Sequence, residues 1–189
     1  MIRGTGRVQA SVAAASVLAL VATGCTGTKV RTIEKSMEPT IRSGEFVELD
    51  SYAYEDGSEP RRGDLISFRG PSGVDTETCG EPGPEGAPCM RPTPELSPET
   101  SLIKRVIALP GDTIAIAADG RAILNGTKRE EPYVIPCKPE DECGLPEEID
   151  VPDGHLFVMG DNRPYSGDSR HFGPIDMDGL EGRVTPPER

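Results

Sequence analysis

Tryptophan is absent from this chain of 189 residues, and aromatic residues make up only 4% of it. Hydrophobic residues reach 35%, so we expect a modest core. Positive charge is also scarce, because 20 Lys and Arg stand against 32 Asp and Glu, which leaves a net charge of −12. Without a basic stripe to displace counterions from a phosphate backbone, a nucleic-acid partner is not expected.

Long helical patterns are lacking as well, apart from the apolar run near the N-terminus. The chain has 19 Pro and 22 Gly, which favour short strands and many turns. We predict a mainly antiparallel β fold in which a core formed by residues 26–117 and 151–189 carries a small inserted lobe, residues 118–150. A Pro/Gly/Glu-rich insertion at 70–100 interrupts the first part of this core. The expected strands cover residues 46–49, 65–68, 101–109, 113–117, 121–124 and 156–159.

Residues 1–25 have the pattern of an export signal. Arg3 and Arg7 precede a mostly apolar run from 8 to 21, and small residues lead to Cys25. This ending is similar to a lipobox, in which the cysteine is lipidated and becomes the new N-terminus. An uncleaved transmembrane anchor is the alternative, although the run is short for a span. In both cases we expect the domain to face outward while it is tethered to the membrane.

Four further cysteines remain when Cys25 is set aside. An even number in an exported chain indicates disulfides. The local pairing would join Cys79 to Cys89 and Cys137 to Cys143, and each bridge would close a short loop. A four-cysteine zinc site is the alternative, but the spacings lack a C-x-x-C knuckle. We therefore expect neither a metal nor another cofactor.

A loop near the C-terminus, residues 160–170, is the most unusual segment of the chain. It places two Asp, two Arg and two Ser between an apolar run at 156–159 and the following turn. A simple surface turn requires Gly and Asn but not this number of charges. The composition indicates a loop that braces itself by Asp–Arg pairs and directs a hydroxyl toward another site. We call residues 160–170 the platform loop.

A lysine within an apolar strand is the candidate partner of this loop. With the period of two that a strand imposes, Lys104 shares a face with Val106, while Arg105 shares the other face with Ile107. Whichever face is buried, one cation must lie among apolar neighbours. Arginine cannot readily lose its proton, whereas desolvation lowers the pKa of a buried lysine toward the range of a general base. Lys104 is thus a candidate base, and Ser36, just before a Pro-containing turn, is a candidate nucleophile.

Histidine offers an alternative base, but the chain has only His155 and His171. His171 lies near Asp168 in the sequence, so a triad of Ser36, His171 and Asp168 is conceivable. We expect both histidines to lie in loops or on the surface instead.

Four motifs occur in a fixed order along the chain. They are S-M-x-P-T at 36–40, R-G-D at 62–64, K-R-V-I-x-L-P-G-D at 104–112 and G-D-N-R-x-x-S-x-D-S-R at 160–170. This series strongly resembles that of bacterial type I signal peptidases, the serine–lysine endopeptidases that release exported proteins from their leader peptides. The resemblance extends from about Ile33 to Ile175, and it implies the antiparallel β-sheet core of that family with a small inserted lobe.

The resemblance also implies roles for individual residues. Ser36 would be the nucleophile and Lys104 its base, while the hydroxyl of Ser166 would hydrogen-bond the lysine amine. Asp168 and Arg170 would brace the platform loop by ion pairing. A shallow apolar pocket would select small residues in an Ala-x-Ala pattern, and its expected lining is Ile33, Met37, Ile41, Leu102 and Ile103.

The partners implied are the signal peptides of exported preproteins and the membrane surface, and the location implied is the extracytoplasmic face of the bacterial cell membrane. One departure is Glu34-Lys35, because many relatives have Ser or Gly two residues before the nucleophile. An ionised carboxylate cannot donate to an oxyanion, so we expect Glu34 to point away from it. Two alternatives stay open: a non-catalytic peptide-binding lipoprotein, and a processing peptidase dedicated to one secreted or conjugation substrate.

Overall fold

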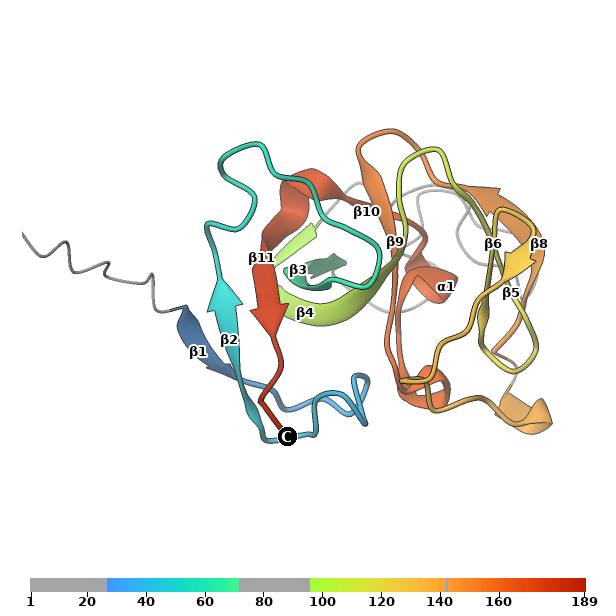
Figure 1. Cartoon of the computed structure of the whole chain (residues 1–189), viewed down its shortest axis with the longest axis horizontal. Helices are drawn as coiled ribbons and strands as arrows, with labels where there is room; N and C mark the ends of the chain where they lie inside the picture. The colour runs from blue at the N-terminus through green and yellow to red at the C-terminus, as the bar shows by residue number, and fades with distance from the viewer. Residues whose placement is uncertain (1–26, 72–95, 142) are drawn as a thin grey trace, which may run out of the picture.

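The computed structural model describes residues 27–71, 96–141 and 143–189 (Figure 1). The expectations for the leader, for Cys25, for a bridge between Cys79 and Cys89 and for most of the 70–100 insertion lie outside these residues. Within the described residues, no helix has the length and apolar character needed to cross a membrane. The described part is built almost entirely from short strands, as the Pro and Gly content indicates.

A seven-stranded antiparallel sheet forms the larger part of the molecule. Its strand order is β1-β2-β11-β3-β4-β9-β10. The strands are β1 Thr28–Arg31, β2 Phe46–Asp50, β3 Leu65–Pro71, β4 Leu96–Ala108, β9 His155–Met159, β10 Ile175–Asp176 and β11 Leu180–Thr185. The prediction of a mainly antiparallel β fold is therefore confirmed.

A smaller sheet packs beside the first one, on the right in Figure 1. Its order is β7-β6-β5-β8, and its strands are β5 Thr113–Ile116, β6 Ala122–Leu124, β7 Thr127–Lys128 and β8 Leu145–Asp150. This sheet includes β5 and so begins at Thr113, before the first residue of the lobe expected at 118–150. The reason is that β5 pairs with β6 and β8 rather than with any strand of the larger sheet.

Helical structure in the described residues is limited to single turns. The α-helix α1 covers Ser169–Phe172, and the 3-10 turns are η2 Pro139–Asp141, η3 Arg163–Tyr165 and η4 Met177–Gly179. Asp168 caps α1 by accepting a hydrogen bond from the backbone N–H of Arg170. The platform loop therefore ends in a capped helical turn.

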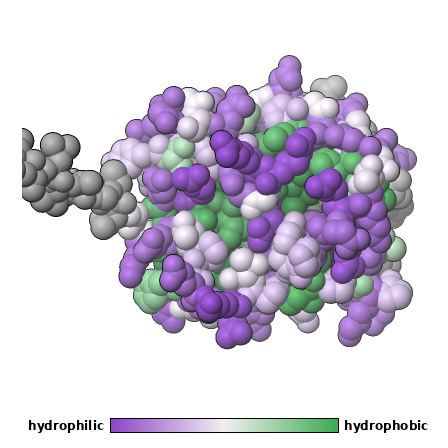
Figure 2. Space-filling model, viewed as in Figure 1, coloured by the Kyte–Doolittle hydropathy of each residue, from purple (hydrophilic) through white to green (hydrophobic). Residues whose placement is uncertain are grey.

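Three hydrophobic clusters hold the two sheets and the loops together. The first joins β4 and β9 to the smaller sheet, and the second packs Phe172 of α1 against the larger one. The third lies beneath the segment after Ser36 and contains Met37, Ile41 and Val47. In the space-filling view the outer rim of the molecule is mostly hydrophilic, and hydrophobic residues show mainly toward the middle of this face (Figure 2).

Strand β4 is the element that positions the candidate site. It pairs with β3 from Leu96 to Arg105, whereas it pairs with β9 only from Arg105 onward. Among the described strands, none pairs with the β9 side of β4 before Arg105. The segment Ser101–Lys104 therefore presents an open strand edge next to the candidate base.

Candidate active site

A turn over Lys35–Glu38 presents Ser36, and apolar anchors hold this turn in place. The backbone N–H of Glu38 donates to the carbonyl of Lys35 at 3.1 Å, and that of Ile41 donates to Met37 at 2.9 Å. Met37 and Ile41 are buried in the third hydrophobic cluster. Burial of the Met37 and Ile41 side chains therefore fixes this turn on the sheet.

Lys104 lies on the buried face of β4, directly beside the serine. Its residue is only 3% exposed, and its Nζ donates a hydrogen bond to Ser36 Oγ at 2.7 Å. Burial lowers the pKa of Lys104 below its usual range, although the charges of Asp168 and Glu34 oppose this shift and Arg170 reinforces it. The face that the period of two assigned to Lys104 and Val106 is buried, which leaves the amine in the environment that a general base needs.

Arg105, the next residue, lies on the opposite face with a different set of contacts. Its guanidinium binds both carboxylate oxygens of Asp161, with Nε–Oδ1 at 2.8 Å and Nη2–Oδ2 at 2.6 Å. It also lies over the ring of Tyr133, 4.0 Å from the centroid. Asp161 in turn accepts a hydrogen bond from the hydroxyl of Thr40. One carboxylate thereby links β4 to the turn that carries Ser36.

The platform loop contacts the backbone of Ser36, the candidate nucleophile, and of Lys35 before it. The backbone N–H of Asn162 donates to the carbonyl of Ser36 at 3.0 Å, and its side-chain amide donates to the carbonyl of Lys35 at 3.1 Å. With the contact between Asp161 and Thr40, the loop holds the Ser36 turn at three points. Asp161 and Asn162 thus hold the turn that carries Ser36, a role that the sequence alone did not indicate.

Asp168 and Arg170 form the ion pair expected within the platform loop. Arg170 Nε and Asp168 Oδ1 are 2.8 Å apart, and Asp168 also accepts from the backbone N–H of Gly160 at 3.0 Å. Arg170 donates further to the carbonyls of Arg163 and Ser166. Burial would raise the pKa of Asp168, but the charge and hydrogen bond of Arg170 outweigh it and hold this pKa far below its usual range. The carboxylate therefore stays ionised and the loop stays cross-braced.

Ser166 differs from its expected arrangement. The residue is 6% exposed, but its hydroxyl has no hydrogen-bond partner in the described part of the chain, so the expected bond to the amine of Lys104 is not formed. The hydroxyl does lie close to the nucleophile's backbone. A Cβ added to Gly160 would come within 2.3 Å of Ser166 Oγ and 2.4 Å of the Ser36 carbonyl oxygen. Glycine is therefore required at position 160, where the platform loop meets the backbone of Ser36. The amine of Lys104 donates its hydrogen bond to Ser36 Oγ instead of contacting Ser166.

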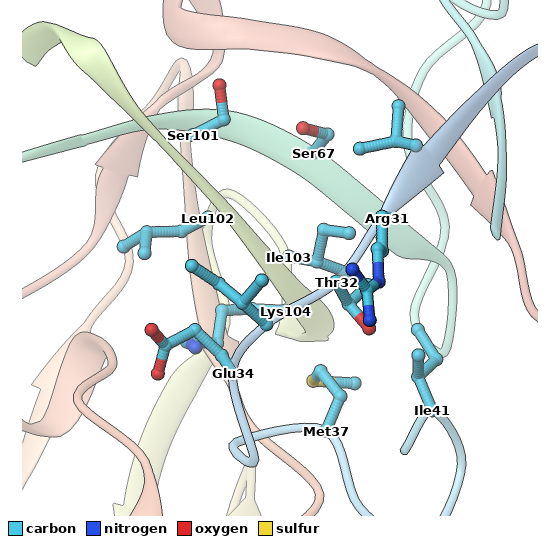
Figure 3. Close-up of a pocket in the computed structure, with 12 residues that line it drawn as sticks. Arg31, Thr32, Glu34, Met37, Ile41, Ser67, Ser101, Leu102, Ile103 and Lys104 are labelled. Carbon is cyan, nitrogen blue, oxygen red and sulfur yellow. The ribbon is translucent and has the colours of Figure 1, made fainter. Parts of the chain in front are cut away.

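All five residues expected to line a substrate pocket border a single cavity next to Lys104. This cavity has a volume of about 110 Å³. Its lining includes Ile33, Met37, Ile41, Leu102 and Ile103, and the last four are labelled in Figure 3. Glu34 lines the same cavity, and the expectation that its carboxylate points away from an oxyanion at Ser36 stays a prediction. The segment after β1 runs along one side of the cavity, and β4 forms the other.

A segment of the smaller lobe supports the platform loop from behind, and nothing in the sequence pattern indicated it. Arg163 is 1% exposed and forms a buried ion pair with Glu131 at 2.8 Å. The backbone N–H of Ile135 donates to the carbonyl of Asp161 at 2.9 Å, and the carbonyl of Ile135 accepts from the backbone N–H of Arg163 at 3.3 Å. Tyr133, which lies under Arg105, belongs to the same segment, in which a turn over Glu131–Val134 leads to Ile135. We call residues 131–137 the brace segment.

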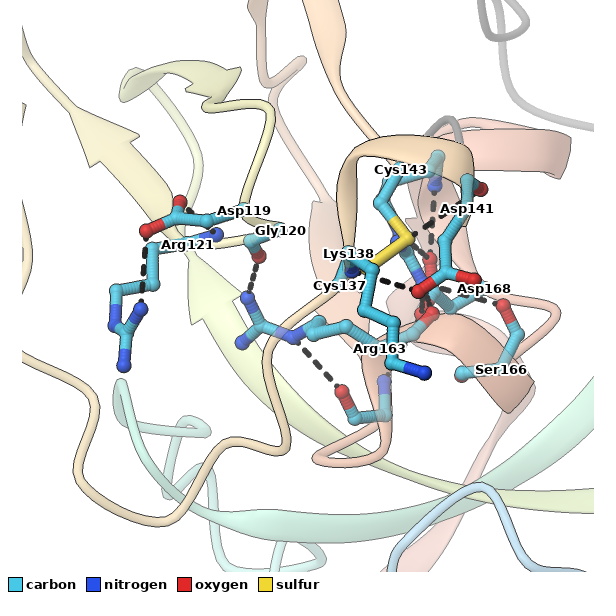
Figure 4. The surroundings of a disulfide bond; sticks show 12 residues. Asp119, Gly120, Arg121, Cys137, Lys138, Asp141, Cys143, Arg163, Ser166 and Asp168 are labelled. Atoms are coloured by element: carbon cyan, nitrogen blue, oxygen red, sulfur yellow. Dashed lines mark hydrogen bonds and ion pairs between the residues drawn. A yellow bond between two sulfur atoms is a disulfide. The ribbon is translucent and has the colours of Figure 1, made fainter.

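The disulfide between Cys137 and Cys143 ends the brace segment (Figure 4). This is the local pairing expected for these two cysteines, with Cα atoms 6.2 Å apart. Their pairing excludes the alternative in which all four cysteines bind zinc, and within the described residues no three His, Cys, Asp or Glu side chains come together as metal ligands. A Cβ on Gly120 would approach both Cys137 and Arg163 to 3.0 Å, so the disulfide packs close to the platform loop.

The histidine alternative is not supported by the contacts. His171 is exposed and borders a different cavity, with Arg170 and Tyr165, while Ser36 Oγ is bonded to Lys104. The carboxylate of Asp168 is occupied by Arg170 and by the Gly160 backbone. His155 begins strand β9 rather than lying in a turn, and its ring contacts the carbonyl of Asp153.

Comparison with known proteins gives the family of the chain. The family model described as signal peptidase, peptidase S26, matches residues 6–187. This chain belongs to the signal peptidase family. Among similar proteins, the signal peptidase I of Bacillus caldolyticus is 34% identical over 160 residues, which cover 79% of this chain and 72% of that protein.

Two further members of the signal peptidase family are similar to the chain. The signal peptidase I of Leptolyngbya laminosa is 34% identical over 151 residues, and the match covers 80% of this chain and 63% of that protein. The crystal structure of a signal peptidase I from Enterococcus faecalis aligns with 26% identity and a TM-score of 0.48, covering 68% of this chain and 98% of the other. As a member of this family, the chain is a signal peptidase by descent.

Proposed function

We propose that this signal peptidase family member is a membrane-tethered serine endopeptidase that cleaves leader peptides after small residues in an Ala-x-Ala pattern. Ser36 is the nucleophile and Lys104 the general base. The single observation that carries this proposal is the 2.7 Å hydrogen bond from Lys104 Nζ to Ser36 Oγ in a buried environment. A desolvated amine can be neutral near pH 7 and can then accept the proton of the attacking hydroxyl.

The reaction divides into two steps that use the same amine. Ser36 Oγ attacks the scissile carbonyl while Lys104 Nζ takes its proton, and the amine then returns a proton to the departing nitrogen as the C–N bond breaks. Water repeats the sequence to release the acyl group from the serine. The backbone N–H of Ser36 makes no hydrogen bond within the described residues, so it can donate to the oxyanion.

The substrate is expected to bind as an added strand. The edge of β4 at Ser101–Lys104 is open beside the base, and the segment after β1 runs along the opposite side of the cavity. An extended peptide between them would gain main-chain hydrogen bonds, while its alternate side chains would enter the cavity. A volume of about 110 Å³ suits a side chain as small as that of alanine and excludes bulky ones.

The proposal also includes a tether between the domain and the membrane. The leader pattern and the resemblance favour a location on the extracytoplasmic face of the cell membrane, with a lipid on Cys25 or an uncleaved anchor holding the domain there. About 11 residues separate Cys25 from Ser36, which limits the reach to roughly 35–40 Å of extended chain. Mass spectrometry of the mature N-terminus distinguishes the two tethers, because one outcome is a diacylglyceryl cysteine and the other an intact Met1.

The catalytic proposal is tested with the full chain in detergent and an Ala-x-Ala leader peptide. We expect wild type to cut the peptide best at neutral to alkaline pH, and Ser36→Ala and Lys104→Ala to lose cleavage by at least about 10³-fold. Ser51→Ala, which changes an exposed serine on the loop after β2, is the matched control and should cut like wild type. A wild-type protein that binds the peptide without ever cutting it would favour the non-catalytic alternative.

A further inference from the structure

Glu34 places an unpaired carboxylate at the candidate site. The residue is exposed, and it lines the same cavity as Lys104 and Leu102 (Figure 3). Within the described residues its side chain has no hydrogen-bond or ion-pair partner. Acidic side chains on a protein surface are common, but this one borders the cavity that holds the catalytic base. Its charge therefore acts on whatever occupies that cavity.

The charge of Glu34 has no local counterpart when the site is ready to react. The charged groups that act on Lys104 are Asp168, Glu34 and Arg170, and Asp168 is already paired with Arg170 at 2.8 Å. Lys104 must be neutral to act as a base, so in that state it gives Glu34 no cation. Arg31 also lines the cavity, but it lies on the opposite side from Glu34 (Figure 3) and no ion pair joins the two within the described residues. A cation supplied from outside would therefore be favourable beside Glu34.

We propose that Glu34 is a specificity-determining residue that favours leader peptides with a basic side chain next to the small residue held in the cavity, and disfavours an acidic one there. This inference rests on the proposed peptidase function. A bound peptide displaces water from the cavity, so the attraction between its cation and the carboxylate is screened less than on an open surface. Discrimination against an acidic side chain follows from the same charge.

The geometry of an extended peptide indicates where the basic residue lies. Successive side chains of a strand point to opposite sides. When one small side chain occupies the cavity, the residues directly before and after it point out toward the rim, where Glu34 is exposed. A positional scan over these two neighbours identifies which of them carries the preference.

The test compares peptides that differ only by Lys, Gln or Glu at the scanned position. We expect wild type to cut the Lys peptide about two- to five-fold faster than the Gln peptide in kcat/KM, the range of an exposed ion pair, and the Glu peptide more slowly than both. Glu34→Gln should make the three rates equal, and Glu34→Lys should reverse their order. Added salt should reduce the wild-type preference. Glu38→Gln, which removes a nearby carboxylate at the end of the Lys35–Glu38 turn and outside the cavity, should keep this preference.

A second measurement separates an electrostatic role from a structural one. The negative charge of Glu34 raises the pKa of Lys104 against the lowering effect of burial. Removing that charge therefore stabilises the neutral amine, and the acidic limb of the pH profile of kcat/KM should move to lower pH in Glu34→Gln. The pair formed by Asp168 and Arg170 is unchanged in this variant, so it does not contribute to the movement. A variant that only disturbed folding would lower the whole profile without shifting its limb.

The outcomes distinguish this inference from the function on which it rests. If wild type cuts peptides in a Ser36-dependent manner, but Lys, Gln and Glu peptides are cut equally and Glu34→Gln leaves both the ratio and the pH limb in place, the role of Glu34 is wrong and the peptidase function stands. If wild type cuts none of the peptides and Ser36→Ala behaves identically, the peptidase function itself is wrong.

Discussion

Lys104 and Arg105 are adjacent basic residues on opposite faces of β4, and their surroundings shift their pKa values in opposite directions. Around Lys104 the protein removes water and supplies a hydroxyl, and burial lowers its pKa. Around Arg105 the protein supplies two carboxylate oxygens of Asp161 and the ring of Tyr133. Burial alone would lower the pKa of Arg105, but the hydrogen bonds and charge of Asp161 outweigh it and raise it.

The comparison teaches that burial alone does not decide the state of a charged group. The Arg105 side chain is 11% exposed and Lys104 is 3% exposed, so both are largely out of water. The two side chains differ in that a carboxylate, that of Asp161, contacts Arg105, whereas Lys104 contacts the hydroxyl of Ser36. On one face of β4, burial without a contacting carboxylate favours the neutral form of Lys104. On the other face, Arg105 stays charged and links β4 through Asp161 to the segment that carries Ser36.

The Lys104→Arg variant, which places an arginine on both faces of β4, is expected to have the largest effect. A guanidinium keeps its proton and cannot act as a base, so we expect kcat/KM to fall by about 10³-fold or more on a leader peptide. Circular dichroism checks that the variant is folded. Cleavage by a folded Lys104→Arg protein at a rate near that of wild type would contradict the assignment of this amine as the base.

Removing the carboxylate of the other face is expected to give the next largest effect. In Asp161→Asn, a neutral amide replaces the two charged contacts to Arg105 and the acceptor of Thr40, all in a buried position. We expect the free energy of unfolding to fall by about 3 kcal/mol in urea denaturation, with a parallel loss of kcat because the Ser36 turn loosens. As a matched control, Asp119→Asn removes more exposed pairs and should cost under about 1 kcal/mol.

The smallest effect tests the burial of Lys104 itself. We expect Lys104→Met to lose activity but to raise the free energy of unfolding at pH 7 by about 1 kcal/mol, because no contacting carboxylate compensates the buried amine. The pKa of Lys104 is lower in the folded state than the unfolded value near 10.5, so the unfolded chain binds more protons between the two values. The cost of the lysine is therefore full below its folded pKa and vanishes above about 10.5.

Urea denaturation at two pH values measures this difference. The advantage of Lys104→Met over wild type should be present at pH 7 and shrink at pH 10. A variant that is less stable than wild type at both pH values would show that the amine contributes net stability. That result would remove the contrast between the two faces.

The period of two in the β4 sequence was sufficient to separate Lys104 from Arg105, since alternation is a local property of a strand. The motif order likewise brought Ser36 and the platform loop into one hypothesis. The short spacing of Cys137 and Cys143 favoured their pairing. These features depend on neighbours in the sequence, or on a resemblance that covers most of the chain.

Contacts between distant segments could not be predicted in this way. Arg105 and Asp161 are 56 residues apart, and Thr40 and Asp161 are 121 apart, so no local pattern joins them. The brace segment carries its key residues, Glu131 and Tyr133, in a stretch without periodicity or motif. The unpaired hydroxyl of Ser166 was missed because its position depends on the exact path of the platform loop rather than on its composition.

The tight approach at Gly160 has a practical consequence for engineering. Even a methyl group there would press on both the Ser166 hydroxyl and the Ser36 carbonyl. Directed-evolution libraries aimed at new cleavage preferences should hold this glycine constant and vary the cavity rim instead. Conversely, an alanine at this single point offers a way to inactivate the protein while every side chain that performs the chemistry is retained.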